Sequence, residues 1–186
     1  MEAIKKIELN KVVKVILIAV LGTLLLTISA KIKIPFYPVP MTMQTFIVLF
    51  LGITLGPKIG LLTVSLYLFE GIFGLPVFAG TPEKGIGLVY FTGPTMGYLI
   101  GFLVAVYFAG SFKYDKGPIN TFLKLIFSVS FIYILGLIWL GTLIGWDKPI
   151  FKLGAEPFLL AELFKILLLL FLTPTLLKTK KLIKIT

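Results

Sequence analysis

Long apolar stretches without charged residues dominate the chain, and segments rich in Gly and Pro separate them. About 20 apolar residues suffice for an α-helix to cross a bilayer. These stretches predict transmembrane helices at about residues 15–30, 42–57, 59–73, 93–112, 121–144 and 158–177. Only 14% of the residues are charged, against about 25% in soluble proteins. We therefore predict an all-α integral membrane protein, a six-transmembrane-helix bundle with structured extracellular loops, as a single membrane domain over residues 1–186.

Prolines set the boundaries of the second and third predicted helices. The stretch "IPFYPVP" contains three prolines, so it cannot form regular helix. The second helix is therefore expected to start near Met41 or Thr42, with Thr42 as its N-cap. Pro57 and Lys58 predict a tight turn into the third helix.

The lysines predict how the helices are oriented. All 18 cationic residues are lysine, and a cytoplasmic N-terminus places twelve of them on the cytoplasmic side, five outside and Lys165 within the membrane. The cytoplasmic group is Lys5, Lys6, Lys11, Lys14, Lys58, Lys113, Lys116, Lys124, Lys178, Lys180, Lys181 and Lys184, and the outer group is Lys31, Lys33, Lys84, Lys148 and Lys152. Positive residues favour the cytoplasmic side. We predict a multi-pass protein of a prokaryotic cell membrane with both termini cytoplasmic, whose net charge of +10 requires no nucleic acid.

The three longest connections, at residues 31–41, 74–92 and 145–157, all fall on the outer face in this topology. Irregular backbone is tolerated at a membrane where it lines a cavity or is packed in protein. Phe36, Tyr37, Phe78, Tyr90 and Phe91 lie in these connections and are expected to line a pocket mouth. The loops thus predict a lidded pocket that opens to the outside.

The residue types that are missing exclude several functions. The chain has no Cys and no His, which excludes thiol chemistry, zinc sites of the usual kind, His general bases and haem ligation by His. The run "GTPEKG" lacks the Lys-Ser/Thr ending of a phosphate-binding loop. We therefore expect no enzymatic activity, no cofactor and no metal site.

Two opposite charges lie within the sixth predicted helix. Glu162 and Lys165 are three residues apart and therefore share a helix face. A charge at mid-bilayer costs about 2.5–3.5 kcal/mol on insertion scales. Three interpretations remain open: a structural ion pair within the bundle, snorkelling to an interface, which suits Glu162 better than the deeper Lys165, or a polar site that faces the bundle, with Lys165 ready for an anion. Glu70, near the end of the third helix, is expected to be an interfacial carboxylate bonded to loop backbone.

Small residues form two regular patterns. Gly93, Gly97 and Gly101 are spaced by four residues on the fourth predicted helix, which favours close helix packing. Ala19, Thr23 and Thr27 form a similar stripe on the first helix. This stripe suits contact with another helix of the same chain or of a partner.

Several motifs together resemble the BioY family. They are "IPFYPVPMTMQTF", "LGPKIG", "YLFEGIFGLPVFAG" and "GPTMGYLIGF", in this order. The resemblance covers about residues 15–175. It implies a biotin-specific substrate-binding (S) component of an energy-coupling factor (ECF) transporter, which captures biotin outside the cell. Its implied partners are a transmembrane coupling protein and two ABC-type ATPases.

The resemblance also implies roles for individual residues. The family's Asp-x-x-Lys pair in the sixth helix, which contacts biotin, reads here as Glu162 and Lys165. We expect Lys165 to pair with the biotin carboxylate and Glu162 to accept ureido N–H bonds. The expected biotin-binding set is completed by Tyr37, Thr42, Gln44, Phe78, Gly80, Tyr90 and Thr95. The family's Ala-x-x-x-Ala face for the coupling protein reads here as Ala19, Thr23 and Thr27.

Three other functions remain open at this point. An S component for another vitamin would share the fold and the mechanism. A stand-alone ion-coupled transporter of small anions would use Glu70, Glu162 and Lys165 as ion or proton relays. An intramembrane enzyme is disfavoured, because no nucleophile–base pairing is evident in a chain without His and Cys.

Overall fold

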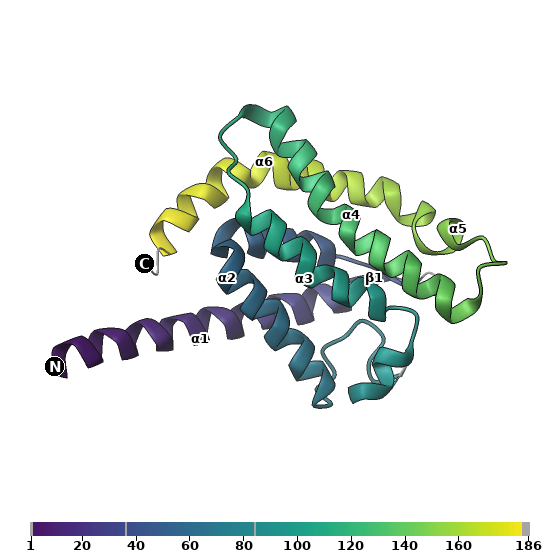
Figure 1. Cartoon of the computed structure of the whole chain (residues 1–186), viewed down its shortest axis with the longest axis horizontal. Coiled ribbons are helices and arrows are strands. Elements are labelled where there is room, and N and C mark those ends of the chain that lie inside the picture. Colours follow the sequence, from purple (N-terminus) through teal and green to yellow (C-terminus); the bar gives the residue numbers. More distant parts are fainter. Residues whose placement is uncertain (1, 36, 84, 184–186) are drawn as a thin grey trace.

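The computed structural model describes residues 2–35, 37–83 and 85–183, and it describes side chains between residues 10 and 181 of these ranges. Five long helices dominate (Figure 1): α1 (Glu2–Lys31), α2 (Gln44–Ile72), α3 (Met96–Ser111), α4 (Gly117–Ile144) and α6 (Leu159–Ile183). The shorter elements are β1 (Lys33–Ile34), β2 (Met41–Thr42), η1 (Gly87–Thr92), α5 (Ile150–Gly154) and η2 (Glu156–Phe158). Phe36, Lys84 and Lys184, named above, lie outside the described residues.

Helix α2 is two helices joined at a sharp bend. Gly56 has φ 78° and ψ 177°, a backbone conformation that interrupts the helix and that glycine adopts readily. Pro57 follows and starts the second half, where its missing N–H is not needed. The second and third predicted helices are therefore the two halves of α2. Counting these halves separately, the described residues form six long helical segments.

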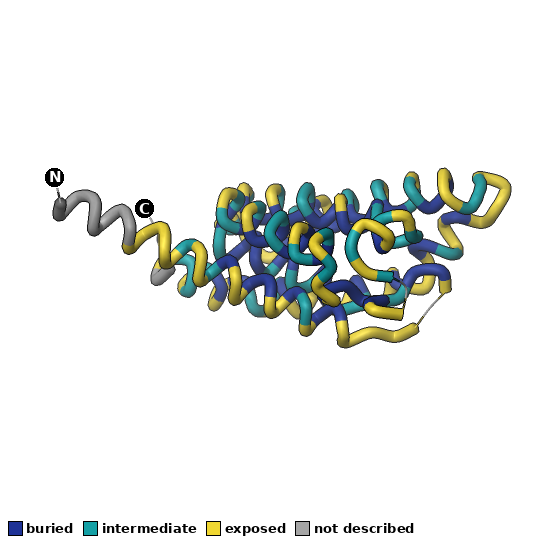
Figure 2. The backbone as a smooth tube through the Cα atoms, turned by 90° about the horizontal axis from the view of Figure 1, so that it is seen from below, coloured by how far each residue is buried: buried dark blue, intermediate teal, exposed yellow. Residues whose placement is uncertain are grey.

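The helices run between two ends of the molecule. The start of α1 and the finish of α6 lie at one end, whereas β1 and α5 lie at the other (Figure 1). Four helices of the described chain are long and apolar enough to cross a membrane, at Asn10–Lys31, Gln44–Ile72, Gly117–Ile144 and Ile150–Lys181. Helix α3 is apolar but shorter. Exposed residues follow the outer sides of the helices (Figure 2), and many are large and apolar, as a lipid-facing surface requires.

Three local predictions need correction. Thr42 is not the N-cap of α2: it lies in β2, paired with Lys33 of β1, and Met43 occupies the cap position. The outer connection 145–157 is not all loop, because it contains α5 and η2. Helix α1 is also longer than predicted, because hydropathy detects only its apolar part and not the polar turns that precede it.

Glycines bring α3 and α4 into close contact. A Cβ atom on Gly101 would lie 2.6 Å from Cα of Ile132, and one on Gly97 would collide with the backbone of Leu135. The packing predicted for this glycine face is therefore present at both positions. Gly93 lies before α3, and its carbonyl accepts a hydrogen bond of 2.8 Å from the indole of Trp139 on α4.

The small-residue stripe on α1 faces the interior of this chain. Ala19 and Thr23 are buried and Thr27 is half-buried. Thr23 donates a hydrogen bond of 2.9 Å to the Glu70 carboxylate on α2. In this arrangement Ala19 and Thr23 serve α1–α2 packing, the contact within the chain that the stripe allowed, and the docking of a coupling protein on this face stays a prediction.

The glycine contact yields a stability prediction. Gly101→Ala is expected to lower the free energy of unfolding by about 1–3 kcal/mol, because its new methyl group meets the backbone of α4. Ile100→Ala is the matched control, since its side chain lies partly exposed on the neighbouring position. Thermal unfolding in detergent micelles measures both variants, and equal melting temperatures would contradict the close-packing role.

Candidate functional site

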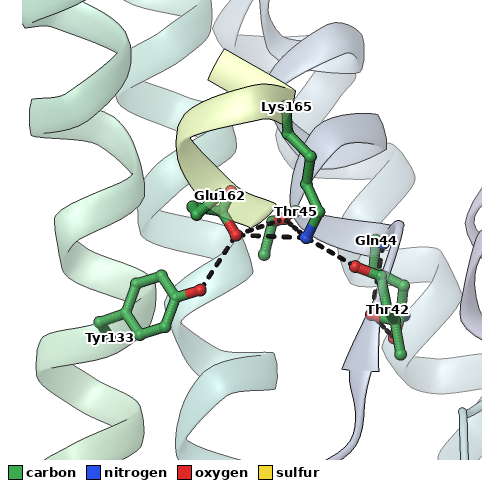
Figure 3. A network of polar contacts seen from close by, with 6 residues as sticks. All are labelled: Thr42, Gln44, Thr45, Tyr133, Glu162 and Lys165. Carbon is green, nitrogen blue, oxygen red and sulfur yellow. Dashed lines mark hydrogen bonds and ion pairs between the residues drawn. The ribbon is translucent and has the colours of Figure 1, made fainter. Parts of the chain in front are cut away.

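A cluster of polar side chains lies between α2, α4 and α6 near the end of the molecule that carries β1 and α5 (Figure 3). Its centre is Oε2 of Glu162, which accepts three hydrogen bonds. Thr45 and Tyr133 donate through their hydroxyl groups at 3.0 Å each, and Lys165 donates through Nζ at 3.3 Å. The carboxylate therefore joins three helices at one atom.

The Lys165 ammonium uses all three of its donors inside the protein. It binds the Thr42 carbonyl at 2.7 Å, the Thr45 hydroxyl at 3.0 Å and Glu162 Oε2 at 3.3 Å. The Thr45 hydroxyl both accepts from Lys165 and donates to Glu162, so it bridges the two charges. Both charged residues are at least 92% buried, at 4% and 8% exposure.

One carboxylate oxygen of Glu162 has no donor. Its Oε1 is buried and meets no hydrogen-bond partner from the described part of the chain. A buried acceptor without a donor costs about 1–3 kcal/mol, more when it carries charge. The site is thus an ion pair with one open acceptor, which favours an N–H donor from outside the protein.

A cavity of about 60 Å3 adjoins this cluster. It is smaller than common small-molecule pockets, which measure about 300–1,000 Å3, but like them it combines apolar walls with a few polar groups. The polar lining comes from Thr42, Gln44, Thr45, Tyr90, Thr95, Tyr98, Tyr133, Glu162 and Lys165. The apolar lining comes from Val39, Pro40, Met41, Ala79, Leu99, Phe102, Ile132 and Phe158.

Gln44 connects the cavity to the loop after α2. Its side-chain amide donates to the Tyr67 hydroxyl at 2.8 Å, and that hydroxyl donates to the Val77 carbonyl at 3.0 Å. The Gln44 carbonyl oxygen accepts from the Thr42 hydroxyl at 3.3 Å. These bonds fix the amide's orientation on the cavity wall.

Aromatic rings form another wall. Tyr90 lines the cavity and stacks on Phe78, with ring centroids 4.7 Å apart. Burial raises the pKa of the Tyr90 hydroxyl above its ordinary value, so this group keeps its proton at physiological pH. Tyr98 and Tyr133 meet edge to face, with centroids 6.3 Å apart. Such pairs give a rigid surface against which a flat apolar ligand can pack.

The structure places six of the nine residues expected to bind ligand on the cavity: Thr42, Gln44, Tyr90, Thr95, Glu162 and Lys165. It does not bring the other three there. Tyr37 is 89% exposed. Phe78 is buried behind Tyr90, and the Gly80 N–H points to the Tyr90 hydroxyl at 3.4 Å.

Glu70 differs from its expected role. Its carboxylate is bonded to Thr23 on α1, not to loop backbone, and it does not line the cavity. Sequence reasoning also missed Thr45 and Tyr133, which bind Glu162 directly. Thr45 follows Gln44 in the proline-rich motif and was detectable there. Tyr133 lies in an apolar helix with no local signal, and only the packing of α4 against α6 reveals it.

The chain is similar in sequence and in fold to several known proteins. A model of the BioY family matches residues 3–182. "Probable biotin transporter BioY" of Pyrococcus horikoshii is 36% identical over 141 residues, which cover 76% of this chain and 82% of that protein. "Biotin transporter BioY" of Thermotoga maritima is 35% identical over 145 residues, covering 77% and 84%. A crystal structure of the S-component for biotin from an ECF-type ABC transporter superposes with a TM-score of 0.75 at 26% identity, covering 91% of this chain and 93% of that one.

The ion pair itself makes a stability prediction. Lys165→Met is expected to lower the free energy of unfolding by about 3–5 kcal/mol, because it leaves the Glu162 carboxylate buried without its cation. Adding Glu162→Gln should recover most of this loss, since the amide oxygen still accepts from Thr45 and Tyr133. Thermal unfolding of the parent, Lys165→Met and the double variant in detergent measures these differences. A double variant less stable than Lys165→Met alone would contradict it.

Proposed function

The chain belongs to the BioY family, and from this membership we propose that it is the biotin-binding membrane subunit of an ECF-type vitamin transporter. One observation carries the proposal beyond family membership: in a buried Glu–Lys pair beside a cavity, one carboxylate oxygen has no donor among the described residues. Biotin offers ureido N–H donors, a ureido carbonyl, an apolar bicycle and a carboxylate. The cavity contains a complementary group for each of them.

The open oxygen of Glu162 is the proposed acceptor for the ureido group. Oε1 is buried and has no donor in the described chain, whereas Oε2 is saturated by three donors. A ureido N–H would satisfy Oε1 and form a charge-assisted hydrogen bond, which is stronger than a neutral one. Glu162 in place of the family's Asp carries its carboxylate one methylene further from the α6 backbone.

Lys165 is the proposed cationic contact for the biotin carboxylate. Its three donors already bind Thr42, Thr45 and Glu162. Binding a carboxylate therefore requires the ammonium to release one of these acceptors. The Thr42 carbonyl is a neutral acceptor, so exchanging it for a carboxylate strengthens the bond.

The remaining lining suits the rest of the ligand. Tyr90, Phe102 and Ile132 offer apolar surface to the bicycle, and Gln44 and Thr95 offer polar groups to the ureido carbonyl or its neighbours. The side chains come from α2, α3, α4, α6 and the segments between them. Such a site closes around a small molecule only when the bundle is assembled.

Import is proposed to depend on partner subunits. The chain has no phosphate-binding motif that would supply ATP hydrolysis, so a coupling protein and two ABC-type ATPases are the proposed source of energy. The lysine distribution supports cytoplasmic termini. With that orientation the end with β1, α5 and the cavity faces outward (Figure 1), and the six helical segments cross the membrane.

Co-purification gives the most direct test of the ligand. Mass spectrometry of the protein purified without added ligand is expected to detect biotin bound in the cavity. Equilibrium dialysis with labelled biotin then measures the affinity of the stripped protein. Another vitamin in the spectrum, together with no biotin binding in dialysis, would assign the chain to a different substrate.

Substitutions at the ion pair test the roles of the two charges. Glu162→Gln and Lys165→Met are each expected to weaken biotin binding by about 10- to 100-fold, the loss of one charge-assisted hydrogen bond. The matched controls are Glu156→Gln and Lys152→Met, because both residues are exposed at the same end of the chain. Removing the ligand's carboxylate, as in biotin methyl ester, should abolish the effect of Lys165→Met and retain that of Glu162→Gln.

Biotin binding by both site variants at the affinity of their controls would place the site elsewhere. Folding is checked separately by thermal unfolding, so a variant that fails to fold is not mistaken for one that fails to bind.

A further inference from the structure

A short segment without helix or strand, residues 77–81, borders the cavity at Ala79, and we call it the wall segment. Ala79 lines the cavity directly, and Phe78 supports Tyr90, which also lines it. The Phe78 ring fits against Gly71, where any Cβ atom would collide with it. The apolar side of the wall segment is therefore anchored by one buried ring.

The polar side of the wall segment is held by Lys31, the last residue of α1. Its ammonium donates to the Phe78 carbonyl at 2.9 Å, to the Thr81 carbonyl at 3.0 Å and to the Thr81 hydroxyl at 3.2 Å. An ammonium has three donors, and these contacts use all of them. Lys31 thus clamps both ends of the turn from Phe78 to Thr81.

Lys33 adds a second clamp from a different element. It lies in β1 and donates to the Ala79 carbonyl at 2.9 Å. Its pairing partner in β2 is Thr42, whose carbonyl accepts the hydrogen bond from Lys165. The residue that holds the cavity-lining Ala79 is therefore tied through the two-stranded sheet to the ion pair.

A third support begins in the cavity itself. Gln44 donates to Tyr67, which donates to the Val77 carbonyl. The carbonyls of Val77, Phe78, Ala79 and Thr81 thus all accept from side chains of other elements. Backbone that makes no regular hydrogen-bond ladder depends on such partners to keep one position.

We propose that Lys31 and Lys33 are positioning residues that hold the wall segment against the substrate and thereby slow its release. The inference rests on the proposed function, because the substrate is taken to be biotin. Neither lysine lines the cavity, so both act through backbone carbonyls. Release requires part of the wall to move, and the two ammonium groups oppose that movement.

Dissociation kinetics test the proposal with the full chain in detergent. Lys31→Met is expected to speed the release of labelled biotin by about tenfold, since it removes charge-assisted hydrogen bonds to two carbonyls, and Lys33→Met by about threefold, since it removes one. Lys33→Arg, which keeps a cationic donor, should restore most of the slow release. Lys58→Met is the control, because Lys58 is exposed beside the α2 bend, and the second half of α2 separates it from the wall segment.

Release from both methionine variants within about twofold of the parent would overturn the proposal. If Lys31→Met yields no folded protein, the biotin release rates of Lys33→Met and Lys33→Arg test the proposal by the same criterion. A parent protein that binds no biotin would refute the proposed function instead.

Amide hydrogen exchange without biotin tests the clamp independently of the ligand. In Lys33→Met, exchange is expected to accelerate in peptides that cover the wall segment and to stay at parent rates in α3 and α4. Uniform acceleration over the whole chain would overturn the positioning role, because it would indicate a general loss of stability. Unchanged exchange in the wall segment would overturn it as well.

Discussion

The ion pair of Glu162 and Lys165 is the contact on which the site depends. Two charges buried in a membrane helix are unfavourable unless they are paired and hydrogen-bonded. Here Thr45, Tyr133 and the Thr42 carbonyl complete the pair, so α2 and α4 both bind α6 through it. The same groups therefore stabilise the bundle and face the cavity, which makes ligand binding and helix packing inseparable at this point.

The incomplete satisfaction of Glu162 separates this site from a purely structural ion pair. A structural pair would gain stability from a donor to each carboxylate oxygen, yet Oε1 has none in the described chain. A ligand with N–H donors supplies what the protein lacks. In the proposed biotin site, affinity would then arise from relieving an unfavourable acceptor as well as from new contacts.

The helices and the wall segment satisfy the hydrogen-bonding capacity of their backbone carbonyls differently. Within the regular turns of the helices, carbonyls accept from backbone N–H groups of the same element, as a lipid environment demands. At the end that carries the cavity, the wall segment is irregular, and side chains of Lys31, Lys33 and Tyr67 bind its carbonyls. Irregular backbone shapes a specific cavity, but its position then depends on a few donors from distant parts of the chain.

The sequence by itself determined the membrane class and the approximate helices, and it predicted Glu162 and Lys165 as a site, because hydropathy, proline positions and charges within apolar segments are local properties. The family motifs also predicted roles for Thr42, Gln44, Tyr90 and Thr95, which all line the cavity. Only the tertiary structure decided that Thr45 and Tyr133 complete the carboxylate's shell, that Tyr37 lies outside the cavity and that Ala19 and Thr23 face α2. These facts depend on how separate helices rotate and pack against one another, and a single helix's residue pattern does not specify that rotation.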